Sequence, residues 1–158
     1  MALWFIRMSY SSKHRKAERG NAMIEFALGF MLLWSMFAGV YQIGYGYYTY
    51  NALMTCVANA AVFGARLGYD TASPSTYATI VQNMALYGDE TAGAHPIVRN
   101  LTASNVNVNV TLDGQGIPRD VTVSITGYSI NALFTSYALT NKPRATSLYY
   151  GQVGCSTC

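Results

Sequence analysis

A long run without any formal charge is the feature that most limits how this chain can fold. No Lys, Arg, Asp or Glu occurs between Phe26 and Ala65. A helix of about 20 apolar residues covers the roughly 30 Å hydrocarbon core of a bilayer, so the run is long enough to cross a membrane. Glu25 is the last charge before it. An acidic side chain costs roughly 2.5 to 3.5 kcal/mol at the centre of a membrane helix and less near an end, so Glu25 should have a partner.

Positive charge is concentrated at the N-terminus. Residues 1–20 carry five basic side chains and one acidic side chain, a net charge of +4, whereas residues 21–158 carry five basic and six acidic side chains, a net charge of −1. The overall charge of +3 therefore belongs to the leader and gives no support for a nucleic-acid partner. Because basic flanks stay in the cytoplasm, we expect the N-terminus inside the cell, close to membrane lipid, and the C-terminus outside.

Residues 22–48 are predicted to form the membrane helix. The run is too long for the h-region of a secretory signal, which spans about 7 to 15 residues, so the helix should be retained. Its aromatic residues recur every three or four positions and mark one helix face. Two interpretations stay open: a stripe that faces lipid and ends in an interfacial belt, or a surface that packs against sister helices. The stripe consists of Phe26, Phe30, Trp34, Phe37, Tyr41, Tyr45 and Tyr48.

The helical pattern continues beyond the predicted membrane span, to about Gly68. A helix from Asn21 to Leu67 would be about 70 Å long at ~1.5 Å per residue, more than twice the hydrocarbon thickness, so its second half must stand outside the membrane. Gly44 and Gly46 could form a soft point where the helix leaves the bilayer. At 158 residues the chain has room for this anchor and one small domain.

The remainder of the chain predicts mixed helix and strand. Ser73 and Pro74 are typical of a helix start and Gly88 of a helix end. Alternating apolar and polar residues predict a strand over 105–112 and another over 121–126, joined as an antiparallel hairpin by the turn residues 113–118. Residues 145–150 could add a third strand, and residues 127–143 were expected to cover one face of the sheet. The covering residues would be Leu133, Phe134, Tyr137 and Leu139.

The start of the apolar run resembles a known processing junction. Gly20 followed by Asn21, Glu25 and Phe26 resembles the leader junction of type IV pilin-like proteins, and residues 51–66 resemble the TadE-like segment of minor pilins from the tight-adherence (Flp) pilus. The resemblance covers roughly residues 19–68. It implies an α+β fold in which a long N-terminal transmembrane helix continues into the periplasm and is followed by a small α+β domain with an antiparallel sheet.

The resemblance also implies boundaries and a function. Residues 1–20 would be a basic cytoplasmic leader, 21–48 the transmembrane helix, 49–68 its periplasmic extension, and 69–158 the periplasmic domain. The protein would be a single-pass protein of the bacterial inner membrane that is cut after Gly20 by a prepilin peptidase. It would act as a structural minor pilin or pseudopilin that supports pilus assembly and cell adhesion, with other pilins or pseudopilins and the inner-membrane assembly platform as partners.

The resemblance assigns roles to particular residues. Gly20 and Asn21 would form the processing site, and Glu25 and Phe26 would act in assembly, with Glu25 paired to the ammonium that the cut exposes on Asn21 or on a neighbouring subunit. A pseudopilin of a type II secretion-like system and an uncleaved, membrane-anchored periplasmic binding module remain as alternatives. Helix packing would use Phe30, Trp34, Phe37, Tyr41, Gly64 and Ala65.

Other reactive residues suggest no catalysis. Cys155 and Cys158 lack the second ligand pair of a zinc site, and a disulfide between them is the favoured state in an oxidising periplasm, with free thiols or bridges to a partner as alternatives. His14 and His95 have no nucleophile or carboxylate pattern beside them. The adjacent Asp89 and Glu90 resemble a solvated loop. The sequence therefore predicts a protein that is not an enzyme and has no cofactor and no metal site.

Overall fold

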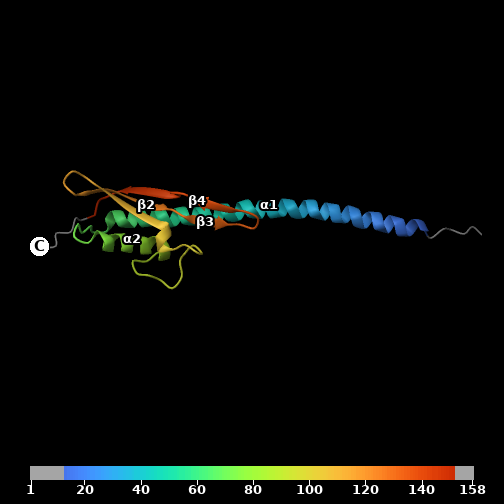
Figure 1. Ribbon diagram of the computed structural model, residues 1–158, viewed down its shortest axis with the longest axis horizontal. Helices are drawn as coiled ribbons and strands as arrows, with labels where there is room; N and C mark the ends of the chain where they lie inside the picture. The colour runs from blue at the N-terminus through green and yellow to red at the C-terminus, as the bar shows by residue number, and fades with distance from the viewer. Residues whose placement is uncertain (1–12, 152–158) are drawn as a thin grey trace, which may run out of the picture. The chain divides into compact units, whose positions relative to one another are not determined.

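The protein is described from a computed structural model, which covers the backbone of residues 13–151 and the side chains of residues 20–151. The predicted α+β class is confirmed (Figure 1). The described part of the chain forms helix α1 (Lys13–Arg66), helix α2 (Pro74–Tyr87), a short 3-10 helix (Ala103–Asn105), and strands β1 (Val106–Leu112), β2 (Pro118–Ile125), β3 (Tyr128–Asn131), β4 (Ser136–Leu139) and β5 (Arg144–Leu148).

Helix α1 begins earlier than the sequence predicts. It starts at Lys13, within the leader, rather than at Asn21, and it ends at Arg66. Lys, Arg, Ala and Glu are strong helix formers, so nothing in residues 13–19 stops the helix. Helix α1 also has no break at Gly44 and Gly46, where the sequence suggested a soft point.

The described chain contains one helix that is long and apolar enough to cross a membrane. The segment Gly20–Arg66 has 47 residues, and its most apolar window has a mean hydropathy of 1.8. Every large apolar side chain from Met23 to Tyr41 is exposed. The chain divides into two compact units, residues 1–41 and 42–158, and α1 contributes residues to both.

The core of the second unit lies between the C-terminal part of α1, helix α2 and the larger sheet (Figure 1). Leu53, Val57 and Ala60 on α1 are fully buried there, together with Val81 on α2 and Val123 on β2. A small domain can bury only a limited fraction of its surface. The last turns of α1 therefore form part of the domain core.

Helix α2 has the ends that its sequence predicts. It begins at Pro74 and is followed by Gly88, which adopts the left-handed conformation (φ 73°) and donates its N–H to the carbonyl of Met84 at 3.0 Å. Only glycine adopts this conformation without a steric cost, which explains the residue type. The buried face of α2 consists of Tyr77, Val81, Ala85 and Leu86.

The main sheet has the strand order β1-β2-β5, and all its pairs are antiparallel. Val108 pairs with Val123, which in turn pairs with Ala145, so the central strand β2 joins the other two. The predicted hairpin and the third strand are confirmed. The ladder contains an irregularity between Thr111 and Leu112, just before the turn into β2.

Most of the residues that were predicted to cover the main sheet from segment 127–143 do not do so, and that part of the prediction is wrong. Strands β3 and β4 form a separate hairpin, with Tyr128 opposite Leu139 and Asn131 opposite Ser136. Tyr128 and Ile130 are buried while the residues after them are exposed, which is the alternation of a half-buried strand. The pattern is only four residues long. Three of the four expected covering residues, Leu133, Phe134 and Tyr137, are exposed instead.

Candidate functional site

The predicted processing junction lies inside helix α1. Gly20, Asn21 and Glu25 are helical and exposed. The side-chain amide of Asn21 donates a hydrogen bond from Nδ2 to Oε1 of Glu25 at 3.0 Å, one helical turn further on. Residues four apart face each other on a helix, so this contact follows directly from the spacing. Glu25 therefore has a polar partner within the uncut chain, and that partner is the residue after Gly20.

Gly20 has no packing role in the part of the chain that the structure describes. A Cβ atom added to it would meet no atom within 4 Å among those residues outside its own helical turn. Glycine within a helix is destabilising by roughly 0.5–1 kcal/mol relative to alanine. The described fold thus gives no reason for glycine at this position.

The aromatic residues after the junction form a continuous stripe. Phe26 and Phe30, Phe30 and Trp34, and Trp34 and Phe37 are consecutive ring pairs, each with centroids 6.2 Å apart. These four rings and the three tyrosines that complete the stripe are exposed. The predicted common face is therefore present. Whether this face contacts lipid or another helix stays a prediction, because contacts within one chain do not test it.

Gly64 and Ala65 serve the core of the second unit. Both are buried. A Cβ added to Gly64 would lie 3.1 Å from the Tyr77 hydroxyl oxygen and from a Val81 methyl carbon, and 3.3 Å from a methyl carbon of Val121. Such contacts are tight, so Gly64 allows α2 and β2 to approach α1 closely. Phe30, Trp34, Phe37 and Tyr41 belong to the other unit, and their packing against another helix stays a prediction.

The C-terminal end of α1 is held by tyrosines that the sequence analysis did not identify. The Tyr77 hydroxyl donates to the Gly64 carbonyl at 2.6 Å, and the Tyr150 N–H donates to the Ala65 carbonyl at 3.0 Å. The Tyr149 hydroxyl donates to the carbonyl of Leu67 at 2.9 Å and accepts the N–H of Tyr69 at 2.9 Å. The last four carbonyls of a helix lack partners inside the helix, and these groups supply partners for two of them, Gly64 and Ala65, and for Leu67 just beyond the helix.

Burial keeps the buried Tyr77 and the half-buried Tyr149 protonated. Burial raises the pKa of Tyr77, with smaller contributions from the nearby Tyr149 and Tyr69. Burial also raises the pKa of Tyr149, although the hydrogen bond from the Tyr69 N–H partly offsets this. Both hydroxyls are therefore neutral donors at physiological pH, suited to cap carbonyls and unsuited to act as a base.

Close contact with the end of α1 also explains why residue 151 is a glycine. A Cβ there would lie 2.8 Å from the Leu67 carbonyl oxygen and 2.9 Å from that of Arg66. These distances are too short for any side chain. The chain after β5 therefore passes directly against the end of α1, and Tyr149 is fixed there by bonds to residues 80 and 82 positions away in sequence.

The remaining candidates lie apart from one another. Asp89 accepts the N–H and the hydroxyl of Thr91, both at 3.0 Å, and these bonds lower its pKa, as expected for a loop turn. His95 is exposed, and Cys56 is a buried free thiol. Residues 20–151 contain no group of three His, Cys, Asp or Glu side chains that could hold a metal ion. His14, Cys155 and Cys158 lie outside the side chains that the structure describes.

The helix and the domain together define the class of protein. A long, exposed apolar helix whose last turns enter the core of a small α+β domain is compatible with a single-pass membrane anchor. Residues 20–62 match the family model of the TadE-like proteins, which confirms the predicted resemblance to this family over that segment. The match begins at Gly20. Comparison with curated proteins and with solved structures gave no match.

The family gives a coarse function. TadE-like pilins are structural rather than enzymatic proteins, and the family links this chain to the tight-adherence pilus and to interaction with other pilus components. The match ends before the last turn of α1, so α2 and the strands lie outside it.

Proposed function

We propose that the protein is a minor pilin or pseudopilin of a tight-adherence (Flp-type) pilus and that a prepilin peptidase cuts it after Gly20. The observation that carries the proposal is Gly20 itself. It is the first residue of the TadE-like match, and it lies within a helix where the described fold gives no reason for glycine. A requirement from outside the chain, such as a protease that must approach the backbone closely, explains the residue.

The cut would change the partner of Glu25. Cleavage after Gly20 makes Asn21 the new N-terminus, so an ammonium group appears on the residue whose side chain already contacts Glu25 at 3.0 Å. An ion pair offsets the desolvation of a carboxylate only when the partner is close and well placed. The ammonium of the same chain, or that of a neighbouring subunit, meets this condition. Phe26 would pack beside this pair during assembly.

The cut would also remove the charge that retains the N-terminus in the cytoplasm. It removes residues 1–20 and their net charge of +4, which is the charge that holds the N-terminus in the cytoplasm. The mature chain would then keep its apolar helix in the inner membrane, with the C-terminal domain in the periplasm, until the assembly platform extracts it. Residues 21–48 would span the bilayer, and residues 49–68 would join the periplasmic domain 69–158.

Mass spectrometry of the membrane-extracted protein tests the cut. With an active prepilin peptidase, the mature chain should begin at Asn21. The Gly20→Val variant should remain uncut, because a branched side chain hinders the approach of the protease. Gly29→Val is the matched control, since a Cβ at either glycine meets no described atom within 4 Å outside its own turn. An intact N-terminus in the presence of the peptidase contradicts the proposal and, if the chain is also absent from purified pili, favours an anchored binding module.

The role of Glu25 is a separate prediction. Glu25→Gln keeps the size of the side chain and removes its charge, so membrane insertion should be normal. The amount of the protein in purified pili should fall at least about tenfold, which corresponds to ~1.4 kcal/mol of lost interaction. Glu90→Gln is the control, because Glu90 lies in an exposed loop of the domain. Equal recovery of both variants in pili would exclude an assembly role for the Glu25 charge.

A further inference from the structure

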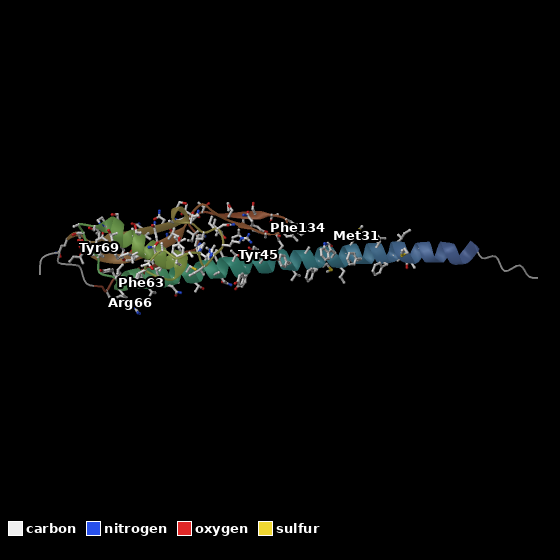
Figure 2. The ribbon with its side chains drawn as sticks, turned by 90° about the horizontal axis from the view of Figure 1, so that it is seen from below. Met31, Tyr45, Phe63, Arg66, Tyr69 and Phe134 are labelled. Carbon is white, nitrogen blue, oxygen red and sulfur yellow. The ribbon has the colours of Figure 1, made fainter. Side chains whose placement is uncertain are left out.

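The tip of the β3–β4 hairpin is bound to one residue of α1. Gln42 is 7% exposed. Its side-chain Oε1 accepts the N–H of Phe134 at 3.0 Å, and its Nε2 donates to the hydroxyl of Thr135 at 2.7 Å. The loop closes on itself through the bond from the Ala132 N–H to the Thr135 carbonyl at 3.0 Å. Figure 2 shows Phe134 at the side of α1, so the helix fixes the position of the loop.

The tip presents apolar side chains to its surroundings. Leu133 is 59% exposed and Phe134 is 67% exposed, with Tyr137 exposed beside them. The hairpin also carries no charge, since no Lys, Arg, Asp or Glu occurs between Asp120 and Lys142. An exposed apolar tip without charges is unfavourable in water, and it is suited to an apolar environment.

The position of Gln42 along α1 indicates which environment this is. Gln42 follows Glu25 by seventeen residues, which is about 26 Å along a helix at ~1.5 Å per residue. If Glu25 marks the cytoplasmic edge of a hydrocarbon core roughly 30 Å thick, the outer edge falls about three residues beyond Gln42. Tyr45, Tyr47 and Tyr48 are exposed at that level, as expected for rings at a membrane–water interface.

We propose that Leu133 and Phe134 insert into the outer interface of the lipid bilayer, as a second membrane contact beside α1. The inference rests on the proposed membrane anchor and adds a part of the domain that contacts lipid. Gln42 makes the contact possible, because it pairs its amide with polar groups of the loop that would otherwise enter an apolar region. The hairpin then fixes how deep α1 lies and which face of the domain meets the membrane.

Fluorescence quenching by lipids with brominated acyl chains tests the contact. The full chain with Trp4→Phe and Trp34→Phe receives Phe134→Trp as its single tryptophan and is reconstituted into phosphatidylcholine and phosphatidylglycerol vesicles. Its emission should be blue-shifted and should lose most of its intensity in brominated lipid. Ile117→Trp on the same background is the control. Ile117 is an exposed apolar residue in the β1–β2 turn. Close to this turn, the carbonyl of Arg119 on β2 accepts the N–H of Tyr149, and Tyr149 lies at the Arg66 end of α1. Its emission should not change.

A third chain separates the anchor from the hairpin. A chain that keeps Trp34 and carries only Trp4→Phe reports the insertion of α1. Quenching of Trp34 without quenching at position 134 overturns the hairpin proposal and leaves the anchor intact, whereas the absence of both signals overturns both. If the tryptophan at position 134 is shielded from acrylamide but not quenched by brominated lipid, another subunit covers the tip and the proposal is wrong.

The tether has its own test. Gln42→Ala removes the three hydrogen bonds that hold residues 134 and 135, so quenching at position 134 should weaken. Gln82→Ala is the control, because it removes a glutamine bond to the carbonyl of Val106 on β1. Unchanged quenching after Gln42→Ala would contradict the assignment of Gln42 as the residue that sets the depth of the tip.

Discussion

Two stretches of the same helix have opposite surroundings. From Met23 to Tyr41, α1 exposes every one of its large apolar side chains, whereas from Leu53 to Ala65 it buries one face within the domain. The exposed stretch is rich in Phe, Trp, Leu and Met, and the buried stretch is rich in Ala with a single Gly. Small residues permit α2 and β2 to pack closely on the helix. Large exposed ones require a cover from outside the chain, because an apolar surface of this size is unfavourable in water.

The comparison is tested most strongly by removing one leucine from each stretch. Leu53→Ala removes a fully buried side chain and should lower the free energy of unfolding of the domain by about 2–5 kcal/mol. Leu33→Ala removes an exposed one and should leave the domain unchanged. Urea unfolding in detergent micelles, followed by near-ultraviolet circular dichroism, measures both. Equal losses would show that the two stretches do not differ as described.

Glycine substitutions give the next largest effect. Gly64→Val introduces methyl groups where even a Cβ would lie 3.1 Å from Tyr77 and Val81, so the free energy of unfolding should fall by roughly 1–3 kcal/mol. Gly39→Val, where a Cβ meets no described atom within 4 Å outside its own turn, is the control. The thermal midpoint of the domain should fall for the first variant only. A stable Gly64→Val protein would mean that α2 can move away from α1 at little cost.

The cap on the end of α1 should contribute less. Tyr149→Phe removes the bond to the Leu67 carbonyl and the acceptor for the Tyr69 N–H, at a cost of about 1–2 kcal/mol. Hydrogen exchange at the Tyr69 amide should accelerate. Tyr47→Phe, on the exposed side of α1, should change neither quantity. Unchanged exchange at Tyr69 after Tyr149→Phe would show that the cap does not protect this turn.

The smallest effect concerns pH. Because burial raises the pKa of Tyr77 above its unfolded value of about 10, its contribution to stability is complete below pH ~10 and is lost as the pH rises toward the higher folded pKa. The loss from this residue should stay below about 1 kcal/mol by pH ~10.5. The midpoint of urea unfolding should fall between about pH 9 and 11, and Tyr77→Phe should make this fall smaller. Urea unfolding measured at steps of ~half a pH unit would resolve the difference. If the urea midpoint of the Tyr77→Phe variant fell as much as that of the wild type, the loss of stability would come from other ionisable groups.

Local patterns in the sequence were sufficient for much of the fold. The charge-free run predicted α1, the strict alternation over 105–112 predicted β1, and Pro74 and Gly88 predicted the ends of α2, because each signal depends on neighbours within a few residues. The contacts that were missed join distant parts of the chain. Gln42 meets Phe134, and Tyr149 meets Leu67, through side-chain to backbone bonds that no periodicity encodes. The β3 strand was missed because its four-residue alternation is too short to distinguish from a loop.

For the candidate site, the sequence predicted which residues matter but only some of their contacts. The spacing of Asn21 and Glu25 places them one turn apart on any helix, and the hydrogen bond between them follows from that spacing. Gly64 and Ala65 were expected to pack, but the sequence could not show that their neighbours are Tyr77, Val81 and Val121 of the same chain. The roles of Gly20 and Glu25 in processing and assembly remain predictions, since they depend on a peptidase and on other subunits.

The cap formed by residues 149–151 determines how a mechanical load would enter the domain. A pull on the C-terminal side of Gly151 reaches Tyr150 and Tyr149 before it reaches β5, and these two residues are bonded to carbonyls at the end of α1. Tyr149 also donates its N–H to the carbonyl of Arg119 on β2 at 2.9 Å, so tension would enter the end of the helix and the central strand together. If the protein is a pilus subunit, as proposed above, the end of α1 and strand β2 would share the load before it reaches β5.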